Sequence, residues 1–205
     1  SRRRDPVYIA TGPSKMKPEG TEIAGKYEVI RQIGKGGMGA VYEALHLQLE
    51  RRVAIKLLHA EVADDAETRA RFEREARAAG RIDHDNVCDV IDFGVSDDGE
   101  PYLVMPFLKG RSLSSVIREM GQLPVERAAD IALQVLSALE RAHSKGVIHR
   151  DLKPDNIFLI RLGDREDFVK LLDFGITKFA RADEPSETTL TADGALLGTP
   201  YYMSP

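Results

Sequence analysis

The chain has 205 residues, 42% hydrophobic and 30% charged, which is typical of a soluble globular protein large enough to bury a core. Its 29 basic and 33 acidic residues give a formal charge of −4, which argues against a nucleic-acid-binding or anionic-membrane surface. No apolar run approaches the ~18 residues that span a bilayer. The single Cys88 cannot form an internal disulfide, so we expect a cytoplasmic protein.

Residues 1–20 are predicted to form a disordered tail. Prolines and glycines are spread among polar residues there, and such a mixture buries too little apolar surface to offset the entropy of ordering. The chain does not begin with methionine, so we interpret it as a piece of a longer protein that could carry a membrane anchor elsewhere.

Two strand-like segments flank a glycine-rich turn. Residues 27–30 and 41–45 alternate like strands, and Gly34, Gly36 and Gly39 lie between them. The spacing Gly-x-Gly-x-x-Gly occurs in dinucleotide-binding folds and in kinases, but a dinucleotide fold needs a helix directly after the glycines. No Gly-Lys-Ser/Thr ending follows, which excludes a P-loop. We therefore interpret the segment as a β-turn that offers backbone amides to phosphates.

A strand that ends in a lysine and a charged helix follow. The strand is residues 53–56, with Lys56 at its end, and residues 67–80 are predicted to form the helix. Glu75 lies beside the apolar face of this helix. Glu73 is about 200° around the helix from Glu75, so both carboxylates cannot face the same cleft.

A hairpin is predicted from residues 87–93 and 102–105, joined by the turn at residues 96–99. Cys88 lies in the apolar run of its first strand, where a buried structural thiol is favoured over a reactive one.

The second half of the chain is predicted to be mainly helical. Ser112 is a predicted N-cap for a helix over residues 113–120, and Gly121 ends it. A long amphipathic helix is predicted from Pro124 to about His143. Its expected core stripe consists of Ala128, Ile131, Ala132, Val135, Leu136, Leu139 and Ala142.

Residues 147–156 form a short loop that carries a carboxylate, an ammonium and an amide: Asp151, Lys153 and Asn156. Pro154 stiffens the turn between them. Together with the glycine turn, Lys56 and the later Asp-Phe-Gly at residues 173–175, this loop resembles the catalytic loop of protein kinases. A second Asp-Phe-Gly, at residues 92–94, precedes the loop and is rejected as a chance match.

The resemblance extends from about Tyr27 to the end of the chain. Lys153, two residues after Asp151, is similar to the serine/threonine branch, and Gly36-Gly37-Met38-Gly39 to the bacterial eukaryotic-like kinases. The implied fold is α+β and bilobal. It consists of a kinase domain over residues 21–205, with a β-rich N-lobe at about 21–105, a hinge at 106–110 and a partial helical C-lobe at 111–205.

The implied activity is transfer of the γ-phosphate of ATP to serine or threonine hydroxyls, with Mg²⁺ or Mn²⁺ as cofactor. The implied catalytic residues are Asp151, Lys153, Asn156, Lys56, Glu75 and Thr199. The implied nucleotide-binding residues are Ile33, Gly34, Lys35, Gly36, Gly37, Met38, Gly39, Val41, Ala54, Lys56, Met105, Pro106, Leu108, Phe158 and Asp173. Asn156 and Asp173 would hold the metal, Lys56 would pair with Glu75, and His149 would pack beneath the loop.

The resemblance also implies partners and control. The expected partners are ATP, protein substrates and a second kinase copy, with no nucleic acid and no membrane contact within these residues. Thr191, followed by Thr189 and Thr188, is the expected phosphorylation site, where phosphate would bind Arg150. The chain stops one residue before the family's Ala-Pro-Glu glutamate. An inactive fragment of an active kinase, and a nucleotide-binding pseudokinase, therefore stay open as alternatives.

Overall fold

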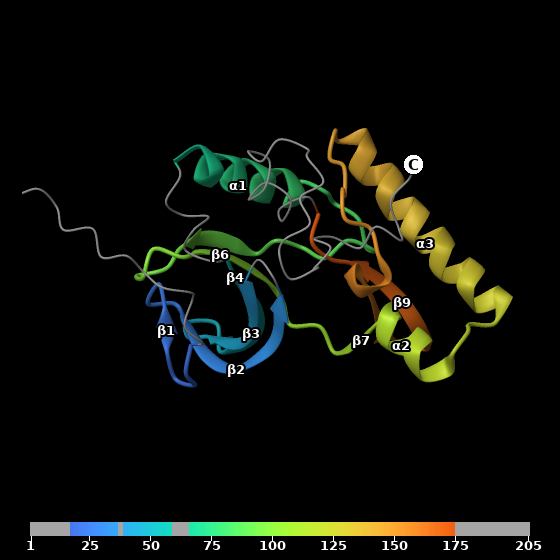
Figure 1. Ribbon diagram of the computed structural model, residues 1–205, viewed down its shortest axis with the longest axis horizontal. Coiled ribbons are helices and arrows are strands. Elements are labelled where there is room, and N and C mark those ends of the chain that lie inside the picture. The colour runs from blue at the N-terminus through green and yellow to red at the C-terminus, as the bar shows by residue number, and fades with distance from the viewer. Residues whose placement is uncertain (1–16, 37–38, 59–65, 175–205) are drawn as a thin grey trace, which may run out of the picture.

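A six-stranded antiparallel sheet and a smaller three-stranded sheet form the frame of the molecule (Figure 1). The computed structural model describes residues 17–36, 39–58 and 66–174. The larger sheet has the order β1-β2-β3-β4-β6-β5. Its strands are β1 (Glu22–Ile23), β2 (Tyr27–Gly36), β3 (Gly39–His46), β4 (Arg51–Leu58), β5 (Asp92–Val95) and β6 (Pro101–Pro106).

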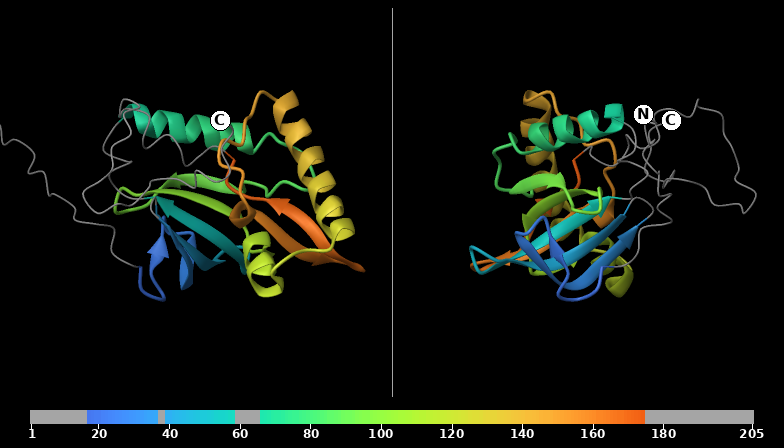
Figure 2. Two further views of the ribbon diagram at one scale, coloured as in Figure 1. Left: turned by 45° about the vertical axis from the view of Figure 1, so that its right-hand side comes forward. Right: turned by 90° about the vertical axis from the view of Figure 1, so that its left-hand side faces the viewer.

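The second half of the chain packs helices around the smaller sheet, which has the order β7-β8-β9. The elements of this half of the chain are β7 (Gly110–Ser112), α2 (Leu113–Met120), α3 (Val125–Ser144), the 3₁₀ turn η2 (Pro154–Asn156), β8 (Ile157–Leu162) and β9 (Arg165–Leu171). The two views of Figure 2 show α1 (Ala66–Ala79) along one side of the larger sheet and α3 beside β9. The expected α+β division into a β-rich and a helix-rich half is thus observed.

Local capping explains where α2 begins and ends. The Ser112 hydroxyl accepts a hydrogen bond from the Ser115 N–H at 3.2 Å, which satisfies a donor that the first helical turn leaves free. Gly121 ends the helix at φ 77°, a left-handed conformation that glycine adopts without a Cβ clash, and its N–H bonds the Ile117 carbonyl. Both predicted ends are confirmed.

The hydrophobic core that matters for the site joins α1, the small sheet and α3. Phe72, Ala76 and Ala79 of α1 are buried in it, as the helix pattern predicts, together with Leu171 and Phe174. A separate core on the larger sheet contains Tyr27, Tyr42, Val53 and Ile55 among others. The buried side of α1 and Phe174, which directly follows Asp173, therefore belong to the same core.

The face of α3 that packs inward differs from the predicted stripe. Ile131, Val135 and Ala142 are buried, but Ala128, Ala132 and Leu136 are exposed. The buried Gln134 fixes the orientation: its Oε1 accepts from Val169 N at 3.0 Å and from Asn86 Nδ2 at 3.1 Å. This polar node turns the Gln134 side of the helix toward β9.

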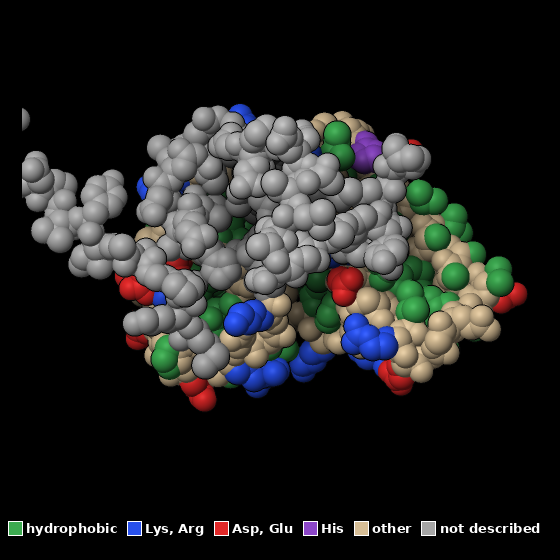
Figure 3. All heavy atoms as spheres, in the orientation of Figure 1, with side chains coloured by type: hydrophobic (Ala, Val, Ile, Leu, Met, Phe, Trp, Pro, Cys, Tyr) green, Lys and Arg blue, Asp and Glu red, His purple; other side chains and the backbone are tan. Residues whose placement is uncertain are grey.

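As a result, an apolar strip of α3 lies on the surface. Val125, Leu133 and Leu136 are 78%, 66% and 60% exposed. Hydrophobic side chains accordingly line this helix in the space-filling view (Figure 3). No helix within the described ranges is both long enough and apolar enough to cross a membrane.

Two further expectations are corrected at the larger sheet. Residues 1–16 lie outside the described residues, but the end of the expected tail is ordered: Lys17 N donates to the Tyr42 hydroxyl at 3.1 Å, and Gly20 N to the Val29 carbonyl at 2.8 Å. The Lys17 ammonium also pairs with Glu100 at 2.9 Å. The hairpin strand expected from residue 87 begins only at Asp92, because Val87 instead bridges Leu171 of β9.

We predict that the Cys88 thiol reacts slowly in the folded protein. Burial raises its pKa to about 12 from its ordinary value of 9.0. The thiolate, which is the nucleophile, is therefore about 1,000-fold rarer at neutral pH. Because Cys88 is the only cysteine, iodoacetamide labelling followed by mass spectrometry reports on it alone. A thiolate of higher pKa is also the stronger nucleophile, which offsets about half of this effect, so we expect labelling in denaturant to be faster by roughly 30- to 60-fold. Equal labelling rates in the native and denatured protein would contradict the assignment of an inert thiol.

Candidate active site

The glycine turn closes a hairpin between β2 and β3, where Gly36 faces Gly39. Gly37 and Met38, at the tip, lie outside the described residues. A Cβ on Gly39 would be 1.9 Å from the Leu57 carbonyl oxygen of β4, so no other residue fits there without a shift of backbone. The requirement at Gly39 is thus close packing of β3 on β4, in addition to the predicted access of phosphates to backbone.

The neighbouring strands bring the predicted nucleotide residues together in the register of the sheet. Val41 of β3 faces Lys56 of β4, and Ala54 of β4 faces Met105 of β6. Cross-strand partners share a face, so these four residues lie over the same region. Of the other predicted members, Ile33, Gly34, Lys35 and Gly36 lie in β2.

The predicted hinge connects the two halves of the molecule. Pro106 is the last residue of β6, and Leu108 lies in the coil before β7. The Leu108 N–H has no hydrogen-bond partner among the described residues, so it is available to a ligand. Phe158, another of the implied nucleotide-binding residues, lies in β8 opposite Ser112.

Three side chains converge in the loop at residues 151–156. The Lys153 ammonium is 2.9 Å from Asp151 Oδ2, and Asn156 Nδ2 donates to the same oxygen at 3.2 Å and to the Asp151 carbonyl at 2.8 Å. The turn η2, which begins at Pro154, folds Asn156 back onto Asp151. The Asp151 carboxylate is thereby held between an ammonium and an amide, and it is partly exposed to solvent.

A backbone connection joins this loop to Asp173. The Leu172 N–H donates to the Asn156 carbonyl at 2.9 Å, and the Leu172 carbonyl is 2.8 Å from His149 Nε2. The His149 ring is buried and lies 4.7 Å from the Phe174 ring. Desolvation by burial lowers the pKa of His149, so the ring is neutral at physiological pH. The expected position of His149 beneath the loop is confirmed.

The expected Lys56–Glu75 ion pair is not formed in this structure. The Lys56 ammonium instead contacts Asp173 Oδ2 at 2.8 Å, and Glu75 faces Arg150 with a separation of 3.9 Å. Glu73 points away toward Arg77, at 3.0 Å. The two glutamates therefore face opposite ways, as the helix geometry predicts, but the inward glutamate meets the loop rather than β4.

The backbone around these pairs is unusual. Arg150 has φ 62° and Asp173 has φ 57°, left-handed values that are costly for residues with a Cβ. Strained residues of this kind collect at functional sites, where the surrounding contacts hold them. Here the strain falls on the two residues that form ion pairs with Glu75 of α1 and Lys56 of β4.

Comparison with known proteins identifies the family. The protein kinase domain family matches residues 27–205. The chain belongs to the protein kinase family. Serine/threonine-protein kinase pkn3 of Myxococcus xanthus is 45% identical over 186 residues, which cover 91% of this chain and 34% of that protein. PrkC of Bacillus subtilis is 40% identical over 186 residues, covering 91% of this chain and 27% of that protein.

Solved structures agree with this assignment. The crystal structure of the PknI kinase domain of Mycobacterium tuberculosis superposes with a TM-score of 0.69 at 33% identity, covering 79% of this chain and 62% of that chain. A structure of Rad53 in complex with AMP-PNP superposes with a TM-score of 0.63 at 27% identity, covering 74% of this chain and 38% of that chain. The predicted protein kinase fold and the likeness to bacterial serine/threonine kinases are confirmed. The chain spans about a third or less of the length of the two curated relatives.

The residues of this kinase suit a hard divalent cation. Asn156 uses its Nδ2 on Asp151, which leaves its Oδ1 for a cation, and its carbonyl accepts from Leu172, the residue directly before Asp173. An amide oxygen and a carboxylate are ligands that Mg²⁺ accepts, with water and phosphate completing its shell. Within the described ranges no group of three or more His, Cys, Asp or Glu is placed to hold a metal.

Part of the predicted site lies outside the described residues, and one contact within them was not predicted. Thr199 and the threonines at 188, 189 and 191 lie outside the described residues. No sequence pattern predicts the contact of Glu75 with Arg150, because these residues belong to separate elements. The expected partner of Arg150, a phosphate on Thr191, lies outside the described residues, and within them Arg150 faces Glu75 of α1.

Proposed function

We propose that this kinase domain transfers the γ-phosphate of ATP to serine or threonine hydroxyls of proteins, including its own, within bacterial signalling. The observation that carries the proposal is the position of the Asp151 carboxylate, within 2.9 Å of the Lys153 ammonium and 3.2 Å of the Asn156 amide. In this arrangement Asp151 is positioned to accept a hydroxyl proton, and Lys153 to stabilise charge that develops on the transferred phosphate. The class proposed is the non-specific serine/threonine protein kinases.

The remaining residues would bind and orient the nucleotide. The glycine hairpin would cover the phosphates, and Leu108 N–H with the Pro106 carbonyl would hydrogen-bond adenine. Asn156 and Asp173 would hold Mg²⁺, or Mn²⁺ in its place, which when bound neutralises phosphate charge. Because Lys56 and Asp173 neutralise each other at 2.8 Å, nucleotide and cation binding would have to separate this pair.

Control of the site would act through Arg150. We propose that phosphate on Thr191, with Thr189 and Thr188 as the next choices, pairs with Arg150 and so competes with Glu75 for it. A phosphate carries close to two charges, whereas the Glu75–Arg150 pair is at 3.9 Å with the arginine 40% exposed, a geometry that contributes little. Release of Glu75 would allow it to reach Lys56.

A pseudokinase is the alternative from another functional class. Such proteins usually lack the strand lysine, the loop aspartate or the metal aspartate, whereas Lys56, Asp151 and Asp173 are all present here. Protein substrates and association with a second copy are part of the proposal. So is a cytoplasmic location, with any anchor supplied from outside these residues.

The test is to incubate the purified 205-residue protein, and a version extended beyond Pro205, with Mg-ATP and a generic protein substrate, and to weigh the intact proteins. We expect mass increases of whole phosphates, absent in Asp151→Asn. Phosphorylation by the extended version alone would identify the shorter chain as an inactive fragment. If neither version transfers phosphate although ATP binds, the pseudokinase alternative replaces the proposal.

A further inference from the structure

A buried carboxylate lies on the face of the larger sheet that carries the predicted nucleotide-binding residues. Glu43 is in the middle of β3, and its side chain is only 1% exposed. Its cross-strand partner is Ala54 of β4, and Val41 lies two residues before it in β3. Side chains alternate along a strand and cross-strand partners share a face, so all three lie on one face. A charge buried there is costly unless it is paired.

Two arginines from the flanking strands neutralise this carboxylate. Arg52 Nη1 of β4 donates to Glu43 Oε1 at 2.9 Å, and Arg31 Nη2 of β2 lies 2.7 Å from Oε2. The second contact lacks the alignment of a hydrogen bond, so it depends on charge alone. Both arginines are more than half exposed, and Glu43 is the buried member. This Glu43 cluster (Arg31, Glu43 and Arg52) therefore ties β2 and β4 to β3.

Strand β2 is irregular on both sides of Arg31. Its register with β3 shifts once before Arg31 and once after Gln32. The extra residues are Ile30 and Ile33, neither of which has a partner in the register of β3. Such β-bulges interrupt the ladder of backbone hydrogen bonds and bend the strand. Only Arg31 and Gln32 hold the register between the two bulges, so side chains have to supply part of the restraint there.

Side-chain contacts hold this short segment on both faces. Arg31 and Gln32 are successive residues of a strand, so their side chains lie on opposite faces. Gln32 Nε2 donates to the Gly34 carbonyl at 3.1 Å and so closes the second bulge from one face. The ion pair of Arg31 with Glu43 holds the segment from the other. Because the glycine hairpin begins at Gly34, its direction depends on how this segment is held.

We propose that Glu43 is a positioning residue for the nucleotide. Through Arg31 it fixes β2 between the two bulges, and it thereby sets the position of the glycine hairpin over the cleft. Arg52 neutralises the other oxygen of the buried carboxylate and ties it to β4. The proposal deepens the proposed nucleotide site and rests on it. Glu43 itself acts through the hairpin and takes no part in phosphoryl transfer.

Three substitutions separate the charge of the cluster from its shape. Glu43→Gln keeps the size of the side chain and can still accept from Arg52, but it no longer attracts Arg31. Arg31→Met removes the cation and keeps an unbranched apolar stem. Arg31→Lys restores the cation. Because the Arg31 contact depends on charge rather than on the planar fork of the guanidinium, lysine should serve in its place.

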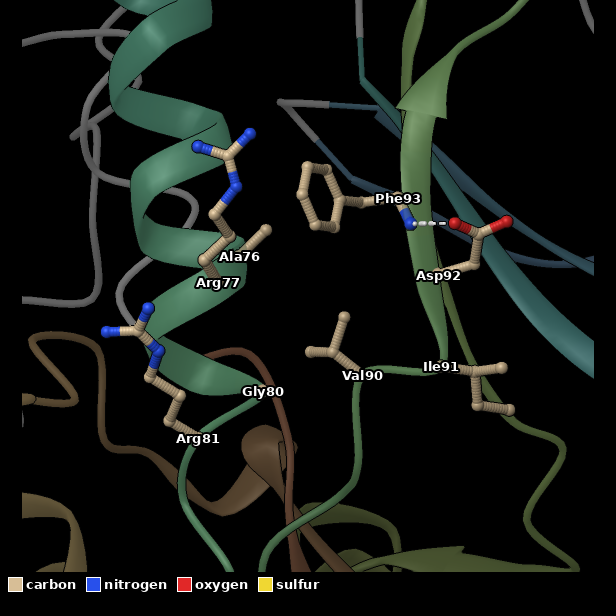
Figure 4. A pocket seen from close by; sticks show the side chains of 8 residues that line it. All are labelled: Ala76, Arg77, Gly80, Arg81, Val90, Ile91, Asp92 and Phe93. Carbon is tan, nitrogen blue, oxygen red and sulfur yellow. Dashed lines mark hydrogen bonds between the residues drawn. The ribbon is translucent and has the colours of Figure 1, made fainter.

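Two other cations of the larger sheet provide matched controls. Lys26, directly before β2, pairs with Asp92 at 3.2 Å. Asp92 also accepts from the Phe93 N–H, and its side chain points away from α1 (Figure 4). This pair holds the start of β2, ahead of both bulges. Arg51 directly precedes Arg52 in β4, so its side chain lies on the other face. Lys26→Met and Arg51→Met thus remove one cation each without release of the hairpin.

Hydrogen–deuterium exchange of the 205-residue protein without nucleotide measures how firmly the hairpin is held. We expect the backbone amides of residues 33–41 to exchange roughly tenfold faster in Arg31→Met and Glu43→Gln than in wild type, because the local restraint is lost. Arg31→Lys and both controls should exchange at the wild-type rate. The amides of α3 should be unchanged in every variant, which distinguishes local loosening from general destabilisation.

Titration with the fluorescent nucleotide mant-ATP and Mg²⁺ measures the consequence for the cleft. We expect the Kd to rise about tenfold in Arg31→Met and Glu43→Gln, because a loosened hairpin has to be ordered on binding. The double variant should lose little more than either single one, since both remove the same contact. At saturating ATP, kcat should stay within about threefold of wild type, as expected when binding rather than chemistry is impaired.

The two measurements decide separately. Equal exchange of the hairpin amides in Arg31→Met and Arg51→Met would overturn the proposal, whether or not the protein transfers phosphate. Faster exchange with an unchanged Kd, or a wild-type protein that does not bind mant-ATP, would also overturn it. If the wild type binds mant-ATP but transfers no phosphate, the proposed function fails and the role of Glu43 stands. Should Glu43→Gln not fold, the comparison of Arg31→Met with Arg31→Lys is decisive.

Discussion

Replacement of Asp173 by asparagine is expected to abolish phosphoryl transfer while leaving most of the stability intact. The change keeps the shape of the side chain but removes the charge that would hold Mg²⁺ and that pairs with Lys56 at 2.8 Å. Loss of a metal-positioning carboxylate should lower kcat by at least about 100-fold. Asparagine can still accept a hydrogen bond from Lys56, so the free energy of unfolding should fall by only about 1–3 kcal/mol.

The matched control is Asp92→Asn in the other Asp-Phe-Gly of the chain. Asp92 is held by Tyr27 and Lys26 in the sheet and does not contact the active site. We expect its variant to lose some stability and to keep its activity within about twofold of wild type. Phosphoryl transfer, measured as incorporated phosphate, and thermal melting are followed for both variants. If the activity of both variants falls only in proportion to their melting temperatures, the assignment of Asp173 as a metal-positioning residue is wrong.

Lys56→Met and Glu75→Gln are each expected to lower kcat/KM by roughly 100-fold, and the double variant by little more than either one. We propose that the two residues act as one unit in the active conformation. In the present structure they are apart, with Lys56 on Asp173 and Glu75 on Arg150. Activation would then require an exchange of partners in which α1 moves toward β4.

The energetics favour an exchange that a ligand can drive. Glu75 and Arg150 are 3.9 Å apart and partly solvated, so the pair contributes about 1 kcal/mol or less. Lys56 is 10% exposed and its contact with Asp173 is short, so that pair opposes activation more strongly. Binding of nucleotide and cation would replace the two charges that Lys56 and Asp173 supply to each other.

The control for this prediction is Glu73→Gln on the same helix. Its contact with Arg77 is an exposed pair four residues apart, worth about 0.2–0.5 kcal/mol. The variant should therefore keep its activity, as measured by initial rates at several ATP concentrations. A loss of activity as large as that of Glu75→Gln would contradict the assignment of Glu75. Strict additivity of the Lys56 and Glu75 effects would contradict the proposal that these two residues act as one unit.

Local features of the site were readable from sequence because their causes are local. Asp151, Lys153 and Asn156 lie within one short loop, so the proline and the spacing suffice to bring them together. The ends of α2 follow from Ser112 and Gly121 for the same reason. The family resemblance extended this reading to the fold, which the comparisons confirm.

Contacts between separate elements required the tertiary structure. A helical pattern establishes that Glu75 and Glu73 point in different directions, but the partner of each depends on how far α1 lies from β4 and from the loop. The predicted stripe of α3 failed for a related reason. Periodicity groups apolar residues on a face, whereas the hydrogen bonds of the polar Gln134 select which edge of that face is covered. Sequence thus determined the chemical groups and their local order, and packing decided which charges meet.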